Sequence, residues 1–509
     1  MKYLLGIDIG TSGTKVSLFD TDFKRIHSYG VEYEVHYPEV GWAEQNPEIW
    51  WNAVCSACHK LDSRHLKSVI GIGVTGQMHG LVLLDKDNAI IRPAILWCDQ
   101  RTQKECDELT QEIGEKTLLD LTGNPALPGF TASKIRWVEK HEQDNFKKIA
   151  KILLPKDYIV FRLTGCYSSD VSDASGTQLL DIAHRSWSET MIHFLHIHSD
   201  QLPLVHESRD IIGGVSKEAA KALGILECTP VVAGAGDQAA SALGNGLIRP
   251  GLMSVTLGSS GVVFAPTATP TSDALGRVHG FCHAIDQQWH LMGVTQAAGT
   301  SLKWVKDELC HEEKTTAKIL NEDVYSVINE EIASVPIGSD GLFFLPYLQG
   351  ERTPHLDSHA KGVFFGLSAY HHRAHMLRAT MEGITYSLLD CYEVLKENHL
   401  EADHVRLAGG GAKSPLWAQM IADTFNISVE RTDVSDAGTL GVALLAGVAV
   451  GEASSLEEAC EKAIHIKDVF RPNPEATNVY QKGYRIYRAL YPALKPIFPL
   501  VDTLREKQK

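Results

Sequence analysis

The sequence carries one short pattern twice, and this repeat constrains the fold more than any other feature. Residues 3–19 consist of two apolar runs on either side of a GTSG turn at residues 10–13, which predicts a β-hairpin. Residues 252–265 repeat the arrangement around a GSSG turn at residues 258–261. Gly10 and Gly258 are 248 residues apart in a chain of 509. Each half is therefore predicted to open with the same hairpin, as the halves of a duplicated protein would.

The segments between and after the hairpins alternate between strand-like and helix-like patterns. Strands are predicted at residues 69–74, 81–84, 91–96 and 404–407, and helices at residues 104–113, 131–141, 374–395 and 415–425. This alternation predicts two α/β domains rather than an all-α or all-β protein. A chain of 509 residues is also too long for one hydrophobic core. The turn-rich residues 245–250 are the expected boundary, which gives domains at residues 1–247 and 248–509.

Charge and cysteine content narrow the choice of partner and compartment. A formal net charge of -15 opposes binding to nucleic acid and to anionic lipid, so a small molecule is the expected partner. No run approaches the roughly 20 apolar residues that a membrane-spanning helix needs, and no apolar core of a signal peptide follows Met1. The close pair Cys55 and Cys58 lacks the second ligand pair of a zinc site, so free thiols are expected. We expect a reduced, cytoplasmic protein, for which a homodimer is an open possibility.

The two hairpin turns are candidates for binding phosphate. A turn of glycines and hydroxyl residues can direct backbone N–H groups and hydroxyls at one phosphate oxygen, although each turn taken alone can also be a plain tight hairpin. Asp8 lies in the apolar run before the first turn, where an unpaired buried carboxylate is costly. A magnesium ion is the partner that would stabilise Asp8 there.

A second aspartate lies at the end of another apolar run. Asp237 follows residues 231–236 (VVAGAG) and precedes Gln238 and an alanine-rich helix. This position suits a catalytic base at the mouth of a cleft, and it also suits an N-cap of the helix. The two roles are compatible.

Three further glycine-containing segments need an interpretation. Residues 409–411 (GGG) join a strand to a helix, and glycines there let a bulky ligand approach the backbone closely. Residues 436–441 lead into a helix of small residues at 442–450, whose role we expect to be close packing. Residues 71–76 match G-x-G-x-x-G but run into another strand instead of a helix, which argues against a dinucleotide site. The chain also lacks the G-x-x-x-x-G-K-[ST] signature of P-loop kinases.

Taken together, these segments resemble the FGGY carbohydrate kinases of the actin, hexokinase and Hsp70 superfamily. Residues 6–15 resemble the first phosphate motif of that family and residues 257–262 the second. Residues 129–137 (GFTASKIRW) are similar to the first family signature, and the segment from 362 to 382 is similar to the second. The resemblance runs from residue 4 to about residue 450. It implies two RNase H-like α/β domains with a catalytic cleft between them.

The resemblance also implies a role for each candidate residue. Asp237 would be the catalytic base, and Asp8 would help to place Mg²⁺. The sugar would contact Met78, His79, Asp237 and Gln238 on the side of the N-terminal domain. ATP would be held mainly by the C-terminal domain, with contacts to Thr11, Ser12, Lys15, Gly258, Ser259, Ser260, Gly409, Gly410 and Gly411. A structural role is the alternative for His79.

Within the family, several segments resemble the branch that phosphorylates D-xylulose. They are residues 77–80 (QMHG), 96–101 (LWCDQR), 154–158 (LPKDY), 172–177 (SDASGT) and 350–355 (GERTPH). Ser259 stands where the family usually has threonine, and Gln238 stands where this branch usually has asparagine. The expected reaction is the ATP-dependent conversion of D-xylulose to D-xylulose 5-phosphate. The alternatives are another acceptor such as glycerol, gluconate or ribulose, a non-catalytic actin- or Hsp70-like ATP-binding protein, and a nicotinamide dehydrogenase.

Overall fold

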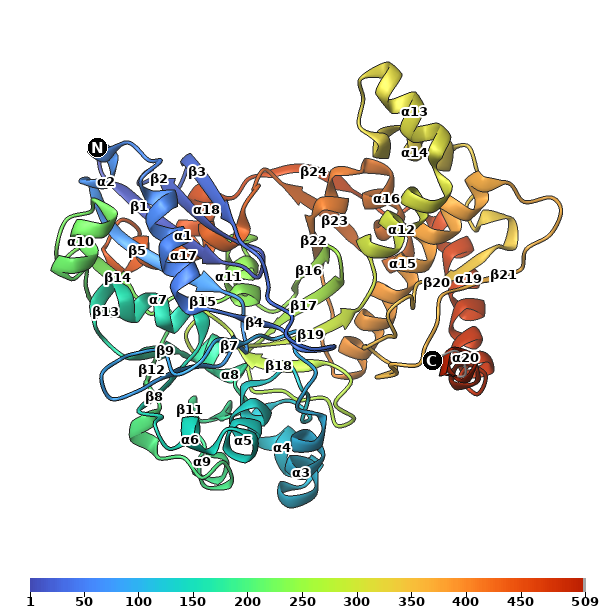
Figure 1. Cartoon of the computed structure of the whole chain (residues 1–509). Coiled ribbons are helices and arrows are strands. Elements are labelled where there is room, and N and C mark those ends of the chain that lie inside the picture. The colour runs from blue at the N-terminus through green and yellow to red at the C-terminus, as the bar shows by residue number, and fades with distance from the viewer. Residues whose placement is uncertain (507–509) are drawn as a thin grey trace.

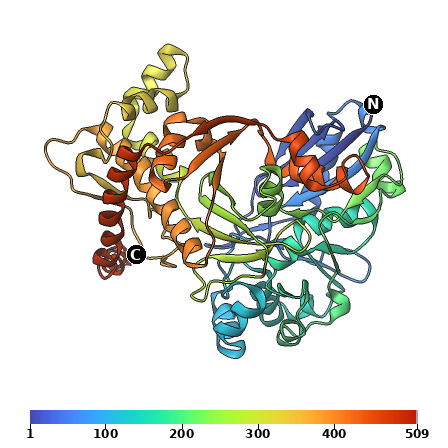
Figure 2. The ribbon, with the colours of Figure 1, turned by 180° about the vertical axis from the view of Figure 1, so that it is seen from behind.

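A computed structural model describes residues 1–506 and contains two lobes, each built on a seven-stranded sheet (Figure 1). The chain ends lie at opposite sides of the molecule (Figure 2). Within residues 1–506, no helix combines the length and the apolar character needed to cross a membrane. The predicted α/β architecture is confirmed.

The first sheet contains the first predicted hairpin. Its strands are, in spatial order, β13 (Ile211–Gly214), β14 (Pro230–Val232), β5 (Val69–Gly76), β1 (Tyr3–Ile9), β2 (Gly13–Phe19) and β3 (Arg25–Glu32). The short β15 (Ala235–Gly236) also pairs with β5. Strands β1, β2 and β3 are antiparallel neighbours, whereas β5 runs parallel to β1 and β14 runs parallel to β5.

The second sheet repeats this arrangement with the second hairpin. Its order is β18 (His279–Cys282), β19 (Trp289–Thr295), β17 (Gly261–Thr267), β16 (Leu252–Leu257), β22 (His404–Gly409), β23 (Ser428–Thr432) and β24 (Ile466–Phe470). Strands β16, β17 and β19 are antiparallel neighbours, and β22 and β23 extend the sheet in parallel with β16. Five consecutive strands of each sheet therefore follow the order 3-2-1-4-5, which confirms the predicted RNase H-like domains. They are β3-β2-β1-β5-β14 in the first sheet and β19-β17-β16-β22-β23 in the second.

Within residues 1–506, five small two-stranded sheets accompany the two large ones. Their pairs are β4 (Glu44–Gln45) with β7 (Ala94–Ile95), β6 (Val82–Leu84) with β8 (Lys151–Leu153), β9 (Ser168–Asp170) with β12 (Leu204–His206), β10 (Leu180–Asp181) with β11 (Ser186–Trp187), and β20 (Phe343–Leu345) with β21 (Val363–Phe365). The strand expected at residues 91–96 is shortened to β7, because Pro93 has no N–H to contribute to a ladder.

Helices cover both sheets. Those of the first half are α1 (Pro47–Cys58), α2 (Ser63–Leu66), α3 (Gln103–Ile113), α4 (Glu115–Thr122), α5 (Thr131–His141), α6 (Gln143–Phe146), α7 (Pro155–Thr164), α8 (Val171–Ser175), α9 (Glu189–Phe194), α10 (Lys217–Leu223) and α11 (Asp237–Gly244). Those of the second half are α12 (Gly299–Leu309), α13 (His311–Leu320), α14 (Val324–Ala333), α15 (Arg373–Glu397), α16 (Pro415–Phe425), α17 (Ala437–Ala449), α18 (Leu456–Ala463), α19 (Pro474–Leu494) and α20 (Phe498–Glu506). The predicted helix at residues 415–425 has the same bounds as α16, because Ser414 caps its first turn and Asn426 ends it in a left-handed conformation.

Helix α17 comes late in the chain but packs on the first lobe, beside α11 and across β1 and β5 (Figure 1). Its backbone approaches the sheet closely, since a Cβ atom on Gly73 would lie 2.1 Å from the carbonyl oxygen of Val442. The same atom on Gly6 would lie 2.2 Å from the carbonyl oxygen of Thr439. Gly73, the middle glycine of the G-x-G-x-x-G match, thus makes room for α17. The element after β5 is strand β6 and not the helix that a dinucleotide site requires.

Helix α17 also begins earlier than the helix expected at residues 442–450. Asp436 occupies the N-cap, so α17 includes residues 437–441, which were expected to precede the helix. Small residues let α17 cross α11 at backbone contact, since a Cβ atom on Gly441 would lie 2.0 Å from the carbonyl oxygen of Ala240. The expected close packing of this helix is present.

Candidate active site

Asp237 lies where the first sheet meets helix α11. It follows β15 directly and is the first residue of α11. Gly236 occupies the N-cap and no side-chain capping bond is present, so the capping alternative does not describe Asp237. Burial raises the pKa of its carboxyl to about 6, against the lowering effect of the Gln238 amides. A carboxylate with a pKa near neutrality is suited to take a proton from a hydroxyl group.

A buried polar network holds the backbone that delivers Asp237. The Gly236 N–H donates to Ser172 Oγ at 3.1 Å, and the Ser172 hydroxyl donates to Asp170. Lys156 Nζ donates to the carbonyl oxygen of Ala233 at 3.0 Å. This fully buried ammonium also pairs with Asp170 at 3.1 Å. Because these contacts hold both ends of the glycine-rich segment before Asp237, they restrict where its carboxylate can point.

Asp8 lies in a cluster of carboxylates at the carboxyl end of β1. Its pKa is raised to about 7, first by burial and then by the proximity of Asp237 and Asp436, while Lys15 opposes the shift. Lys15 Nζ forms an ion pair with Asp436 Oδ2 at 3.2 Å. The start of α17 faces Asp8, since a Cβ atom on Gly438 would lie 3.3 Å from Asp8 Oδ2. Three acidic side chains and one lysine thus share this corner of the site.

No expectation from the sequence covered Asp436, whose segment was assigned to helix packing alone. The signal that could have found it is its position, because it precedes the small residues that start α17. An aspartate at that point lies at the positive end of a helix dipole. Its ion pair with Lys15 brings the second half of the chain to the first hairpin.

The first hairpin turn is tied to the neighbouring strand ends through Thr11. Trp97 Nε1 donates to Thr11 Oγ1 at 2.9 Å, and Thr11 Oγ1 donates to Gln77 Oε1 at 3.2 Å. The Gly10 N–H closes the turn on the carbonyl oxygen of Gly13 at 3.0 Å. Ser12 is exposed. The turn is therefore fixed on one side and open on the other.

The second turn lies beside the third glycine cluster and the start of α12. Gly409 pairs in register with Leu257, so the GGG segment follows directly beside the turn that starts at Gly258. The Gly299 N–H donates to the carbonyl oxygen of Gly258 at 2.9 Å. Ser259 is exposed, and so are two glycines of the GGG segment. The structure thus brings the candidate nucleotide residues of the second half, which are Gly258, Ser259, Ser260, Gly409, Gly410 and Gly411, to adjoining strand ends.

Met78 and His79 follow the carboxyl end of β5, next to Asp237. The Met78 side chain packs against Gly236, where a Cβ atom would lie 3.1 Å from its Sδ. His79 has a positive φ of 68°, and its carbonyl oxygen accepts from Lys134 Nζ at 2.8 Å. Lys134 belongs to the segment at residues 129–137, so this segment fixes the backbone of His79.

The protonation of His79 follows from its contacts. Nδ1 lies 2.6 Å from the carbonyl oxygen of Gly176, which can only accept, so Nδ1 carries the proton and Nε2 presents a lone pair. Burial lowers the pKa of the imidazole to about 3. His79 is therefore a neutral acceptor near pH 7.

His79 lines a cavity of about 480 Å³ between the two lobes. The first half contributes Trp97 and Phe130 to its wall, and the second half contributes His279, Phe281 and Arg352. Among the candidate site residues within residues 1–506, His79 alone lines this cavity. A polar cavity with aromatic walls at a domain junction is suited to a small hydroxylated ligand.

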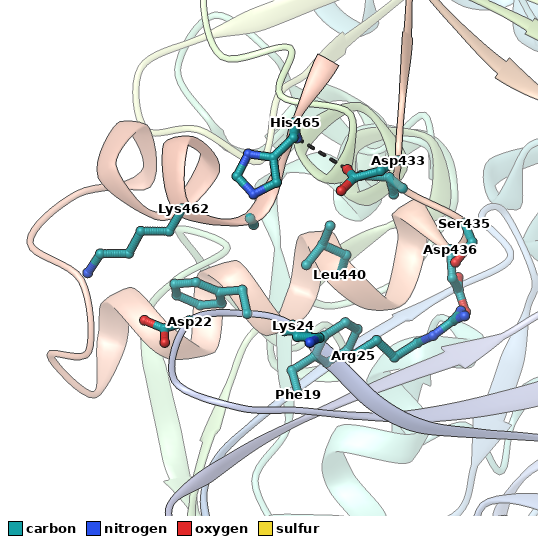
Figure 3. A pocket seen from close by; sticks show the side chains of 13 residues that line it. Phe19, Asp22, Lys24, Arg25, Asp433, Ser435, Asp436, Leu440, Lys462 and His465 are labelled. Atoms are coloured by element: carbon teal, nitrogen blue, oxygen red, sulfur yellow. Dashed lines mark hydrogen bonds between the residues drawn. The ribbon is translucent and has the colours of Figure 1, made fainter. Parts of the chain in front are cut away.

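A second cavity, of about 540 Å³, borders the acidic corner through Asp436 (Figure 3). Its wall is formed by the turn after β2, the segment before α17 and the end of α18, with Lys24, Arg25 and Lys462 among its charged residues. Asp433 accepts from the His465 backbone N–H at 3.2 Å across this wall. Within residues 1–506, none of the candidate site residues lines it. Asp436 lines it as well, so the two regions share one residue.

The described residues contain no group of three or more His, Cys, Asp or Glu side chains arranged to hold a metal ion by themselves.

Comparison with known proteins agrees with this geometry. Residues 3–244 match the N-terminal domain of the FGGY family of carbohydrate kinases, and residues 253–450 match the C-terminal domain. The chain belongs to the FGGY family of carbohydrate kinases. It is therefore a sugar kinase, and the actin-like binding protein and the dehydrogenase are set aside.

The relatives include several xylulose kinases. The chain is 38% identical to the xylulose kinase of Bacillus subtilis over 99% of its own length and 100% of that protein. It is 39% identical to the xylulose kinase of Escherichia coli, covering 97% of this chain and 99% of that one. The crystal structure of a xyloylose kinase from Brucella ovis superposes with a TM-score of 0.89 at 35% identity, covering 97% of this chain and 99% of that one. A gluconokinase of Bacillus subtilis is 32% identical over 99% of this chain and 96% of that protein.

Proposed function

We propose that this sugar kinase transfers the γ-phosphoryl group of ATP to D-xylulose and forms D-xylulose 5-phosphate. The observation that carries the proposal is that Met78 packs against Gly236, the residue before Asp237, while His79 lines the adjoining cavity. Full-length relatives called xylulose kinases support the choice of acceptor. The proposed domains remain residues 1–247 and 248–509, with α17 as the element that returns to the first lobe.

In this reaction Asp237 accepts the proton of the terminal hydroxyl group of the sugar. The hydroxyl oxygen forms its bond to the γ-phosphorus as the bond from that phosphorus to the β-phosphate bridging oxygen breaks, and ADP leaves. Met78, His79 and Gln238 orient the sugar for this attack. Thr11, Ser12, Lys15, Gly258, Ser259 and Ser260 contact the phosphates, and Gly409, Gly410 and Gly411 border the adenosine.

The residues around Asp8 fit a magnesium ion that arrives with the nucleotide. Burial first, and then the proximity of Asp237 and Asp436, raises the pKa of Asp8 to about 7, a cost that a nearby divalent cation would relieve. When bound, the ion would neutralise charge on the phosphates. Asp8 would hold it directly or through water, and Lys15 would keep Asp436 turned toward the same corner.

A second candidate acceptor is D-gluconate. The specific observation in its favour is the gluconokinase relative, together with the structure of a gluconate kinase from Lactobacillus acidophilus that superposes with a TM-score of 0.91 at 28% identity. A xylulose kinase from the same organism superposes equally well, also at 28% identity. Fold similarity alone therefore does not separate the two acceptors.

We also propose a compartment and an oligomeric state for the protein. All ten cysteines are free in the described structure, which supports a reducing cytoplasmic location. The homodimer remains a prediction.

The test is a coupled assay of ADP release with D-xylulose, D-gluconate, L-ribulose and glycerol at equal concentrations. We expect the highest kcat/KM for D-xylulose, and product analysis should find the phosphate on O5. A higher kcat/KM for any other member of the panel rejects D-xylulose as the acceptor. ADP release that needs no acceptor at all would reject transfer to a sugar.

A further inference from the structure

Arg352 is a charged residue that the proposed mechanism leaves unused. It comes from the second half of the chain and lines the same cavity as His79. Within residues 1–506, its guanidinium has no hydrogen-bond or ion-pair partner, and burial lowers its pKa. The Arg352 side chain is partly buried on the cavity wall, and its N–H groups are available to donate to a ligand there.

The backbone around Arg352 is held on a rigid support. The Glu351 carboxylate accepts from the Gln296 N–H at 2.9 Å, the Arg352 N–H at 2.7 Å and Thr295 Oγ1 at 2.7 Å. The Thr353 N–H donates to the carbonyl oxygen of Val294 in β19 at 3.0 Å. Glu351 is thus engaged by two backbone N–H groups and by a threonine hydroxyl. Its charge opposes the lowering of the Arg352 pKa, but no ion pair joins the two side chains among the described residues. Such support fixes a side chain in a binding site at low entropic cost.

The other polar groups of the cavity complement a guanidinium donor. The Asn124 amide nitrogen donates to the carbonyl oxygens of Gly280 and Thr122, so its amide oxygen faces His279 Nδ1 at 2.8 Å. The proton of His279 therefore lies on Nδ1, and Nε2 is an acceptor, as in His79. The cavity combines two neutral imidazoles that accept with two guanidinium groups that only donate. Arg277 is paired with Asp273 and Glu397, whereas no such ion pair involves Arg352 among the described residues.

We propose that Arg352 is a sugar-binding residue that donates to the C2 carbonyl oxygen of the acceptor ketose, at the end of the sugar remote from the phosphorylated hydroxyl. A carbonyl oxygen only accepts, so it matches the guanidinium, while the neighbouring hydroxyls donate to His79 and His279. This inference rests on the proposed function. It makes the second lobe a contributor to sugar recognition as well as to nucleotide binding.

The test compares Arg352→Met, Arg352→Lys and the wild-type enzyme. A hydrogen bond to a charged group contributes about 1.5–3 kcal/mol, so Arg352→Met should raise KM for D-xylulose by roughly 10- to 150-fold. KM for ATP should stay within about twofold, and Arg352→Lys should recover part of the loss because it keeps a positive donor. Arg485→Met serves as a matched control, since Arg485 is exposed on α19.

The acceptor panel shows which oxygen Arg352 contacts. D-Arabinitol is D-xylulose with C2 reduced to an alcohol, so Arg352→Met should lower kcat/KM for D-xylulose more than kcat/KM for D-arabinitol. An equal loss for both sugars overturns contact with the carbonyl oxygen. Calorimetric titration of each variant with D-xylulose alone should show the same weakening without ATP, because the cavity already contains residues of both lobes.

Separate outcomes identify which proposal fails. A wild-type enzyme that does not use D-xylulose, or that prefers D-gluconate, rejects the proposed function and this inference together. Wild-type activity with an unchanged KM in Arg352→Met rejects the inference alone. If Arg352→Met does not fold, as judged by its circular dichroism melting curve, the folded Arg352→Lys variant decides, and a D-xylulose KM equal to that of the wild type overturns the proposal.

Discussion

The two lobes use the same strand order but place different chemistry at equivalent positions. Asp8 in β1 corresponds to Thr256 in β16, each two residues before the first glycine of its turn. Asp8 faces Lys15 on the returning strand, whereas Thr256 faces Val262. The first hairpin therefore carries charge where the second carries a neutral hydroxyl.

The same contrast holds at the next strand of each sheet. Strand β5 ends at Gly76, paired with Ile9, and β22 ends at Gly409, paired with Leu257. Beyond these equivalent ends, the first lobe has a glutamine, a methionine and His79, while the second has two more glycines. The side chains of the first lobe suit hydroxyl groups, and the bare backbone of the second suits a large flat ligand. We therefore expect substitutions at the strand ends of the two lobes to affect different ligands.

The largest effect is expected for Asp237→Asn, which removes the proposed base from the first lobe. General bases typically contribute 10²–10⁴-fold, so kcat should fall by about that factor while KM for ATP stays nearly unchanged. Steady-state kinetics with saturating D-xylulose and ATP measures this. Asp144→Asn is the control, since its side chain is 95% exposed. Retention of more than about a tenth of the wild-type kcat would remove Asp237 from the role.

The pH dependence should report the same carboxyl group. Asp237 must be ionised to accept a proton, and its pKa is raised to about 6. With saturating magnesium and ATP, kcat/KM for D-xylulose should therefore be constant above about pH 7 and fall as the pH drops through 6, approaching tenfold per unit. A profile that stays flat down to pH 5 would contradict this assignment.

Asp8→Asn should make the folded protein more stable but less active. The pKa of Asp8 is 3.8 in the unfolded chain and about 7 in the folded one, so the folded state binds more protons between these values. Stability from this group is thus lost as pH rises through the folded pKa. Thermal melts should show Asp8→Asn more stable than wild type by on the order of 2 kcal/mol at pH 8, with the difference shrinking toward pH 4. Activity should be strongly reduced. A wild-type protein that is the more stable one at pH 8 would contradict the clustering argument.

Equivalent positions in the two lobes should respond to different ligands. His79→Asn keeps a residue that tolerates the positive φ of 68° but shortens its reach, so KM for D-xylulose should rise roughly tenfold with KM for ATP unchanged.

Gly410→Ala should raise KM for ATP and leave KM for D-xylulose unchanged. A Cβ atom there meets nothing within 4 Å, so the variant should fold normally and lose only nucleotide affinity. Gly411→Ala is the contrasting variant, since its Cβ would lie 2.7 Å from Leu257 Cβ and should lower the melting temperature. Equal changes in both KM values for either variant would break the division between the lobes.

Local patterns were enough to predict the framework of the molecule. The two hairpins, helix α16 and the end of β5 follow from turn residues, caps and apolar runs, all of which act within about ten residues. The contacts of α17 could not be predicted in this way, because Gly6 and Gly73 serve a helix that lies more than 350 residues away in the sequence. For the same reason the pattern around Gly73 imitated a nucleotide motif.

The residues of the candidate site also differ in how far local sequence could reveal them. Asp237 and His79 stand at strand ends, where sequence alone raises the expectation of function. Asp436 carries no such local mark, and Arg352 was marked only as part of the family-like segment 350–355. Their roles depend on an ion pair with Lys15 and on a position in a cavity shared with His79. Such long-range pairing depends on how the lobes pack, and the periodicity of a sequence carries no information about that packing.

The smallest expected effect concerns Ser172, whose network belongs to the first lobe. The Ser172 hydroxyl accepts from the N–H of Gly236, the residue before Asp237, and donates to Asp170. Ser172→Ala leaves that N–H without its partner, and a hydrogen bond of this kind contributes about 0.5–1.5 kcal/mol. If this contact positions the base, kcat should fall by roughly two- to twelvefold while both KM values stay near wild type. Ser172→Thr keeps the hydroxyl and should recover most of the rate, and Ser326→Ala, at an exposed position in α14, should have no effect. A lower melting temperature with an unchanged kcat would assign Ser172 to stability alone, and the backbone before Asp237 would then be held by Lys156 without it.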